Sequence, residues 1–355
     1  MKSALRQTAT PQHRSRTRGN DQQHPKTPSS GQHPRRRFLH LAAGAAALPA
    51  LSRIARAQTY PMRPVRIIVG SAPGGTQDIV ARLIGHWLSE RLRRQFIIEN
   101  RTGGGINVAT EAVVKAPPDG YTLLLVGSVN AINATLYEKL NFTFLRDIAP
   151  VASVASGPLV MLVHPSIPTR SVPEFIAHVK ANPGKISFGS SVPGSPLQMA
   201  GEMFKMMAGV DMTIVPYRGT APMLTDLLGG QLQVTIADLP PSIEHIRTGR
   251  LRALAVTTAE RSPALPAIPT IGDFLPGFEA SIWQGVGAPR NTAAETVDKL
   301  NKEINAALAD PTIKARLAEL GGVVLAGSPA DFGKLIADET EKWGNVIRAL
   351  NIKAE

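Results

Sequence analysis

Short apolar runs alternate with segments of helical periodicity along most of the chain after residue 64. The runs Val65–Val69, Phe96–Asn100 and 121–126 predict buried strands, because each is a short and mostly apolar stretch bounded by turn residues. Between the first two runs, apolar residues recur every three or four positions over 79–88, which is the spacing of an amphipathic helix. Strands separated by such helices indicate an α/β fold with a mostly parallel sheet.

The second half of the chain repeats this alternation with a second set of elements. Its strands are predicted at 159–163, 186–188, 213–217, 234–236, 251–256 and 281–286, and its helices at 172–180, 201–208, 221–228, 293–309, 311–320 and 329–350; a helix at 108–114 belongs to the first set. Two comparable sets indicate two lobes, and strand-like crossings near 158–163 and 279–287 predict two chain passages between them. We expect residues 58–159 and 282–355 to form one lobe and 160–281 the other. Ligands of such sheets lie beyond the carboxyl ends of the strands, so the cleft between the lobes is the expected site.

The first 57 residues differ in composition from the rest. Residues 1–34 are polar and are predicted to be disordered, because they lack the apolar surface that a core requires. Arg35, Arg36 and Arg37, an apolar run over 41–51 and a small-residue site before Gln58 then follow in the order of a cleaved export signal. That run is shorter than the roughly 20 apolar residues of a membrane span. The paired arginines favour the twin-arginine route over an ordinary secretory signal, and either route predicts a soluble periplasmic protein.

The net charge of +12 at first suggests a nucleic-acid-binding protein. However, residues 1–57 hold 11 of the 39 Lys and Arg side chains and one acid, Asp21, so the remainder carries 28 basic and 26 acidic residues. The folded part is therefore nearly neutral, and no nucleic-acid partner is expected. The absence of cysteine excludes disulfide scaffolds, thiolate metal sites and cysteine nucleophiles.

The first candidate binding element is the turn between the strand Val65–Val69 and the helix after it. Gly74 and Gly75 permit a close backbone approach, and Thr76 adds a hydroxyl at the start of the helix. The free N–H groups and partial positive charge of a helix N-terminus suit a carboxylate or phosphate. Asp78 is placed to accept hydrogen bonds from the turn itself. The motif lacks the Walker and dinucleotide spacings, and a tight connection without a ligand is the alternative.

A second turn of this kind spans 188–196 and places Ser190, Ser191 and Ser195 before another helix. A serine nucleophile is one reading of it, but the Gly-x-Ser-x-Gly pattern is absent. The folded part holds four histidines, whose local contexts mark neither a catalytic base nor a metal site; they are His86, His164, His178 and His245. We therefore expect no metal and no cofactor.

Other candidates follow the predicted strands. Ser128 comes after the strand at 121–126, and Tyr217 and Arg218 follow the strand at 213–217. The Arg218 guanidinium matches the geometry of a carboxylate, but the local sequence favours a solvated turn or an inter-lobe ion pair over this contact. Asp238 is placed either to receive a ligand ammonium or hydroxyl group, or to cap the helix that begins at the following prolines.

The order of several short motifs over nearly 300 residues resembles the periplasmic solute receptors of tripartite tricarboxylate transporters, the Bug (Bordetella uptake gene) or TctC-like family. The motifs are Tyr-Pro at 60–61, Pro-Val-Arg-Ile-Ile-Val at 64–69, Pro-Gly-Gly-Thr at 73–76, Asp-Ile-Val-Ala-Arg at 78–82, Glu-Asn-Arg at 99–101, Pro-Asp-Gly-Tyr-Thr-Leu at 118–123, Val-Pro-Tyr-Arg-Gly at 215–219, Asp-Leu-Leu-Gly-Gly-Gln at 226–231, Gly-Arg-Leu-Arg-Ala-Leu-Ala-Val-Thr at 249–257, Pro-Thr at 269–270, Pro-Gly-Phe-Glu at 276–279, Ala-Pro at 288–289 and Lys-Leu-Asn at 299–301.

The resemblance implies a two-lobed, type II-like periplasmic-binding-protein fold that closes on a small carboxylate. It also implies that the turns at 73–78 and 189–195 hold the ligand from opposite lobes, through backbone amides, hydroxyls and water. The receptor would be a monomer without enzymatic activity that delivers its ligand to membrane permease subunits. An exported α/β hydrolase or lyase using Ser190 or Ser195 is the alternative, and a ligand sensor with another partner is a third reading.

Three positions depart from the family pattern. Ala237-Asp238 stands where the family often has an asparagine second, Gln77 is bulkier than the usual residue, and Val192-Pro193 replaces Gly- and Asn-containing turns. An added anion at Asp238 would disfavour a di- or tricarboxylate and favour a ligand with a donor or a cation, such as an amino acid. The sequence therefore predicts a carboxylate receptor whose ligand differs from a simple tricarboxylate.

Overall fold

The computed structural model describes residues 60–354, which belong to one compact unit. The predicted disordered extension, export signal and cleavage site before Gln58 lie outside the described residues. No helix in the described part of the chain combines the length and apolar character that a membrane crossing needs.

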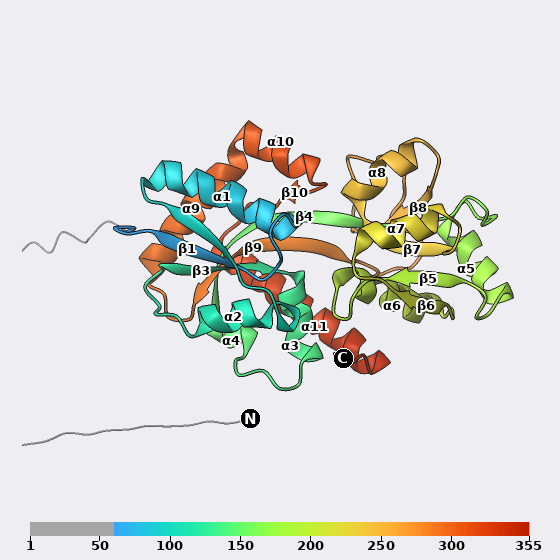
Figure 1. Cartoon of the computed structure of the whole chain (residues 1–355), viewed down its shortest axis with the longest axis horizontal. Coiled ribbons are helices and arrows are strands. Elements are labelled where there is room, and N and C mark those ends of the chain that lie inside the picture. The colour runs from blue at the N-terminus through green and yellow to red at the C-terminus, as the bar shows by residue number, and fades with distance from the viewer. Residues whose placement is uncertain (1–59, 355) are drawn as a thin grey trace, which may run out of the picture. The chain divides into compact units, whose positions relative to one another are not determined.

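The described chain alternates strands and helices (Figure 1). The strands are β1 (Val65–Val69), β2 (Phe96–Asn100), β3 (Thr122–Gly127), β4 (Ile148–Val163), β5 (Ser187–Ser190), β6 (Thr213–Pro216), β7 (Val234–Asp238), β8 (Arg252–Val256), β9 (Ser281–Pro289) and β10 (Val323–Val324). The helices are α1 (Thr76–Leu92), the 3-10 turn η1 (Gly104–Ile106), α2 (Asn107–Val114), α3 (Ser128–Leu136), α4 (Phe144–Asp147), α5 (Val172–Ala181), α6 (Pro196–Ala208), α7 (Thr220–Leu228), α8 (Leu239–Arg247), α9 (Ala294–Ala309), α10 (Pro311–Glu319) and α11 (Pro329–Leu350).

Two sheets with the same strand order organise the fold. The five main strands of sheet A run β2-β1-β3-β9-β4, with the two-residue β10 pairing antiparallel to β4, and sheet B runs β6-β5-β7-β4-β8. Among the five main strands of each sheet, the fourth is antiparallel to both of its neighbours, while the other four are parallel to one another. Each sheet thus combines three parallel strands, one inserted antiparallel strand and a fifth strand beyond it, which fits the mostly parallel sheets expected from the sequence.

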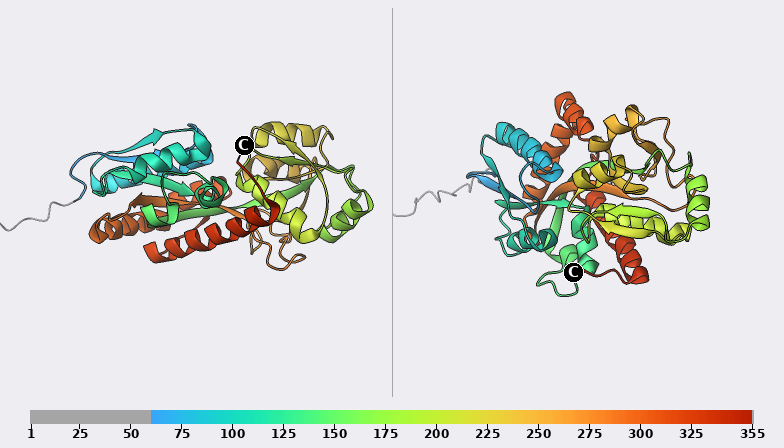
Figure 2. Two further views of the ribbon diagram at one scale, coloured as in Figure 1. Left: turned by 90° about the horizontal axis from the view of Figure 1, so that it is seen from below. Right: turned by 45° about the vertical axis from the view of Figure 1, so that its right-hand side comes forward.

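The long strand β4 belongs to both sheets (Figures 1 and 2). It pairs with β9 from Ile148 to Pro158, and with β7 from Leu159 to Val163. The pairing of β4 with β9 contains two register shifts before Ser156, and its pairing with β8 contains one between Met161 and Leu162. The change of partner along one continuous strand marks where the chain leaves one sheet for the other.

Sheet A is buried on both faces because its central strands alternate two apolar sets of side chains. Leu123 and Leu125 of β3 pack in a core with residues of α1, α9 and α10, whereas Leu124 and Val126 pack in a core with residues of α2, α4 and α11. Period-two alternation of apolar residues on both faces is typical of strands covered by helices on each side. A third core lies around sheet B and includes side chains of α5, α6 and α7.

Most elements agree with the apolar pattern, and two differ clearly. The strands β1 and β2 and the helix α11 have the predicted bounds. The first crossing strand begins at Ile148, ten residues before the predicted crossing near 158, because an Ala-, Ser- and Gly-rich stretch is held between β9 and β10. The helix α3 was not predicted: it begins at Ser128, directly after β3, and its asparagines are buried.

Candidate functional site

The loop between β1 and α1 is shaped by glycine. Gly74 has φ +83°, a left-handed conformation that suits a residue without a Cβ, and an added Cβ there would meet nothing within 4 Å. Gly75 occupies the N-cap position of α1, where the glycine supplies no side chain to accept a hydrogen bond from the helix. The loop thus exposes its backbone to the space in front of the helix.

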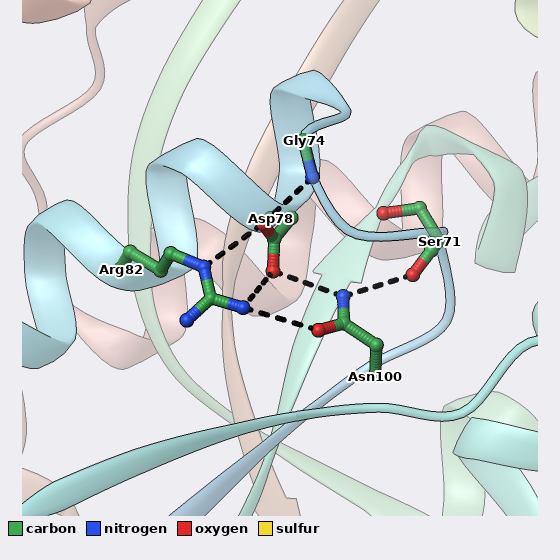
Figure 3. Close-up of polar contacts among 5 residues, drawn as sticks. All are labelled: Ser71, Gly74, Asp78, Arg82 and Asn100. Carbon is green, nitrogen blue, oxygen red and sulfur yellow. Dashed lines mark hydrogen bonds and ion pairs between the residues drawn. The ribbon is translucent and has the colours of Figure 1, made fainter.

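Asp78 holds this loop from below (Figure 3). Its carboxylate accepts hydrogen bonds of 2.9 Å from Gly74 N, from Arg82 Nε and from Asn100 Nδ2. The Asp78 side chain is 3% exposed, and its hydrogen bonds with Arg82 lower its pKa from 3.8 to about 2. Since both carboxylate oxygens already accept protein donors, the structure assigns Asp78 to shaping the loop.

The N-terminus of α1 keeps free hydrogen-bond donors. Among the residues that the structure describes, no acceptor lies within hydrogen-bond reach of the backbone N–H groups of Thr76, Gln77 or Asp78. The first turn of a helix always has such orphan donors, and here no cap side chain uses them. Together with the helix dipole, they form an environment that favours an anion.

The loop between β5 and α6 takes the equivalent place in sheet B. Gly194 has φ +76°, and its N–H donates to Gln198 Oε1 at 2.8 Å, four residues later, as that of Gly74 does to Asp78. Ser195 caps α6 by accepting a hydrogen bond from Gln198 N at 3.2 Å, and Pro196 has no N–H. The Ser190 hydroxyl is buried and lies 3.4 Å from the carbonyl oxygen of Ser191, which is also buried.

The second loop packs against α3. A Cβ at Gly194 would lie 2.6 Å from Leu136 Cδ2 and 3.5 Å from Asn133 Oδ1. At the start of α3, Ser128 is buried, and the Asn130 amide oxygen accepts the N–H of Gly127 at 2.9 Å. The structure therefore places Ser128 on the same helix that the second loop contacts.

Tyr217 and Arg218 differ in their surroundings. The Tyr217 hydroxyl donates to Asp226 Oδ2 at 2.6 Å, and burial followed by this hydrogen bond raises its pKa to about 12. Arg218 is exposed and forms no ion pair with any residue between 60 and 354. The inter-lobe ion pair considered from the sequence is thus not formed within the described chain.

Asp238 lies at the boundary between β7 and α8. It occupies the N-cap position of α8 without capping it, because Pro240 and Pro241 have no N–H groups at the second and third helical positions. Instead, its carboxylate accepts a 2.6 Å hydrogen bond from the Thr220 hydroxyl. Burial raises the pKa of Asp238. The capping role considered from the sequence is therefore corrected by the structure.

A cavity of about 190 Å³ joins Asp238 to the start of α1. Its lining comes from Thr76 of α1, Asp238 and the prolines of α8, residues 155–158 of β4, Gln284 of β9 and the end of α10. Two of the residues singled out in the sequence, Thr76 and Asp238, thus line one cavity, whereas the other candidates lie outside its lining. The cavity is small compared with the roughly 300–1,000 Å³ typical of drug-sized ligands, so it fits a small solute.

Two glutamines lie near these loops, and only one of them stood out in the sequence. Gln284 is buried in β9 and lines the cavity, and it is the one amide in an otherwise apolar strand-like run. The Gln77 side chain reaches the end of β3, where its Nε2 lies 2.7 Å from the position of a Cβ built on Gly127. Sequence reasoning marked Gln77 as unusual but did not find Gln284, whose role depends on where β9 crosses.

Within residues 60–354, no group of three or more His, Asp or Glu side chains is arranged to hold a metal ion. The Ser195 hydroxyl is engaged with its own helix, and His164 Nδ1 lies 2.7 Å from the Ser166 hydroxyl. The described site thus consists of backbone amides, hydroxyls, amides of glutamine and one carboxylate.

Comparison with known proteins places this geometry in context. Residues 80–352 match the model of the tripartite tricarboxylate transporter family receptor, TctC. The protein BugT of Bordetella pertussis is 36% identical over 300 residues, which cover 84% of this chain and 92% of the relative. A structure of an R. palustris protein with adipate is 38% identical, with a TM-score of 0.72 over 83% of this chain and 99% of that one. MatC from Rhodopseudomonas palustris with bound malate is 30% identical, with a TM-score of 0.69 over 81% and 100% of the two chains.

Proposed function

We propose a function that starts from one premise: the chain belongs to the tripartite tricarboxylate transporter receptor family, the TctC or Bug family of two-lobed periplasmic solute receptors. As a member of that family, it is a solute-binding protein. We propose further that its solute is a small carboxylate held between the two sheets. The receptor would pass this ligand to the membrane permease subunits of a tripartite transporter.

The observation that carries the carboxylate proposal is the uncapped N-terminus of α1. Three backbone N–H groups without acceptors in the described chain face an exposed glycine turn, in which an added Cβ at Gly74 meets open space. A carboxylate would accept these N–H groups and gain from the helix dipole. The relatives solved with adipate and malate support this chemistry, since both ligands are dicarboxylates.

We assign the ligand contacts to the two strand–helix loops and to the cavity beside them. The free N–H groups of Thr76, Gln77 and Asp78 would hold the carboxylate from one side, beside the turn formed by Gly74 and Gly75. The other proposed contacts are the hydroxyls of Ser128, Ser190, Ser191, Ser195 and Tyr217, the Arg218 guanidinium and the Asp238 carboxylate. Asp78 supports the first loop from beneath. The lobe boundaries 58–159 with 282–355 and 160–281 remain our proposal, which is supported by the change of partner along β4 between Pro158 and Leu159.

We propose that the protein is not an enzyme. The serines of the alternative reading make local contacts, because the Ser195 hydroxyl caps α6 and that of Ser190 lies near its neighbour's carbonyl. A receptor predicts closure on a solute without product. Export through a cleaved, twin-arginine type signal before Gln58 and a monomeric state complete the proposal.

A thermal unfolding screen tests this function. The full chain, unfolded and refolded to remove any ligand that co-purifies, would be screened against carboxylates, amino acids, aromatic acids and sugars. A ligand at about 100 times its Kd adds about 2.7 kcal/mol to the free energy of unfolding, which raises the melting temperature measurably. We expect hits confined to carboxylates, recovered unchanged by NMR after incubation. Product formation would instead support an enzyme, and hits confined to sugars would contradict the carboxylate assignment.

A further inference from the structure

We propose that the ligand of this receptor carries a protonated amine, and that Asp238 is the residue that selects it. This inference rests on the proposed function, because it identifies a second functional group on a ligand whose carboxylate, in that proposal, binds at the N-terminus of α1. The ligand class is therefore an amino acid rather than an unsubstituted organic acid.

The first support is the composition of the cavity. Asp238 is the one ionisable side chain in its lining, which contains no Lys, Arg or His. A carboxylate that is partly withdrawn from water without a cation is unfavourable, and a ligand ammonium group would offset that cost. A second ligand carboxylate at the same place would instead be repelled.

The second support is that the protein leaves Asp238 largely unused. The prolines at 240 and 241 remove the helix N–H groups that a capping aspartate would bind. The Thr220 hydroxyl donates to Oδ2 of Asp238, and no other side chain among the described residues donates to this carboxylate. An aspartate that neither caps its helix nor forms an ion pair is available to a ligand at the cavity wall.

The third support is the arrangement of opposite polarities around one cavity. Thr76, at the positive end of α1, lies in the same lining as the Asp238 carboxylate. Gly321, after α10, lies against α8 so closely that an added Cβ would be 3.1 Å from Pro240 Cγ. This contact brings α8 and the segment after α10 together at the wall of the cavity that Thr76 and Asp238 share.

The test compares ligands that share a skeleton and differ at one group. Binding of aspartate, malate and succinate to the refolded full chain would be measured by calorimetry, followed by glutamate, 2-hydroxyglutarate and glutarate, and by alanine, lactate and propionate. In the series that binds, we expect the amine-bearing member to bind at least tenfold more tightly than the other two. Equal or tighter binding of a hydroxy or unsubstituted acid would overturn the inference while leaving the carboxylate receptor intact. Absence of binding by all nine would overturn it together with the proposed function.

Asp238→Asn is the informative variant, because it keeps the size and the acceptor for Thr220 but removes the charge. We expect it to abolish the preference for the amine and to bring the three affinities of a series within about threefold. Glu244→Gln is the matched control, since Glu244 lies on α8, is exposed, pairs with Arg247 and is outside the cavity lining. Should Asp238→Asn melt below the assay temperature, Thr220→Val provides the second variant, which leaves the charge in place and should preserve the preference. A preference that survives in folded Asp238→Asn, or is lost equally in Glu244→Gln, contradicts the assignment.

Discussion

The β1–α1 and β5–α6 loops occupy equivalent places in two sheets of the same strand order. Each contains a glycine with positive φ, and each glycine N–H donates to a side chain four residues later. The loops differ in what comes next. Gly75 leaves the first turn of α1 uncapped, whereas Ser195 and Pro196 use or remove donors at the start of α6. The same backbone shape therefore leaves the first N–H groups of the helix free in one sheet, whereas in the other a serine cap and a proline use or remove two of them.

The supporting side chains differ as well. In the first loop the acceptor is the charged Asp78, paired with Arg82, and in the second it is the neutral amide of Gln198. The Asp78 carboxylate beneath the first loop is compatible with the proposed binding of an anion there, because its charge is already balanced by the Arg82 guanidinium. The first loop is thus held by a charge that pH can remove, and the second loop is not.

The largest expected effect is on the free energy of unfolding at neutral pH and on its dependence on pH. Because the pKa of Asp78 is lowered from 3.8 to about 2, its contribution is fully present above about pH 4 and is lost as pH falls toward 2. We expect Asp78→Asn to lower the free energy of unfolding at pH 7 by on the order of 2 kcal/mol, and by less at pH 2 to 3. Urea unfolding at several pH values would measure this, with Gln198→Ala as the control for the second loop. A loss for Asp78→Asn that does not change with pH would contradict the charge-based account.

The next effect is on binding. Thr76→Pro would give α1 the same first residue that α6 has in Pro196, and proline is tolerated at this position of a helix. It removes one N–H from the proposed carboxylate site, so we expect about tenfold weaker binding, since a hydrogen bond to a charged group contributes about 1.5–3 kcal/mol. Thr76→Val keeps the N–H and separates the loss of the hydroxyl from the loss of the amide. Equal affinities of the proline variant and the parent chain, by calorimetry, would remove α1 from the site.

The smallest effect on stability comes from exchanging the caps. Gly75 has φ −74° and ψ 163°, and an added Cβ would have ordinary contacts of 3.5 Å or more, so serine fits there. We expect Gly75→Ser to raise the free energy of unfolding by a few tenths of a kcal/mol and yet to weaken carboxylate binding severalfold. Ser195→Gly should lose a similar few tenths without weakening binding as much. Denaturant titrations combined with calorimetry would show whether stability and affinity move in opposite directions at Gly75.

The sequence predicts much of the fold because its strands are continuous apolar runs between turn residues. β1 and β2 could be bounded in this way, and α11 by its serine, its proline and its long period. The start of β4 was missed since its small residues have little strand propensity and are fixed by pairing with β9. The helix α3 was missed because asparagines in a sequence are typical of turns. In the structure, Asn130 accepts the N–H of Gly127 and Asn133 donates to Asn107, so both are buried inside a helix.

The site was predictable in its parts and not in its assembly. Glycine turns before helices could be recognised locally, and the resemblance to a family suggested which of them face each other. The cavity shared by Thr76 and Asp238 depends on where β4, β9 and the end of α10 meet, which no local pattern specifies. Gln284 enters the lining only because β9 crosses there.

The shared strand order also sets an order of assembly for a chain synthesised from its N-terminus. All five strands of sheet B are present once Val256 has been made, whereas sheet A lacks β9 until Pro289. Until then one edge of β3 is unpaired, and so is the edge of β4 at residues 148–158 that will pair with β9. The later-made strand therefore enters between two strands already present, and the first sheet to begin is the last to be completed.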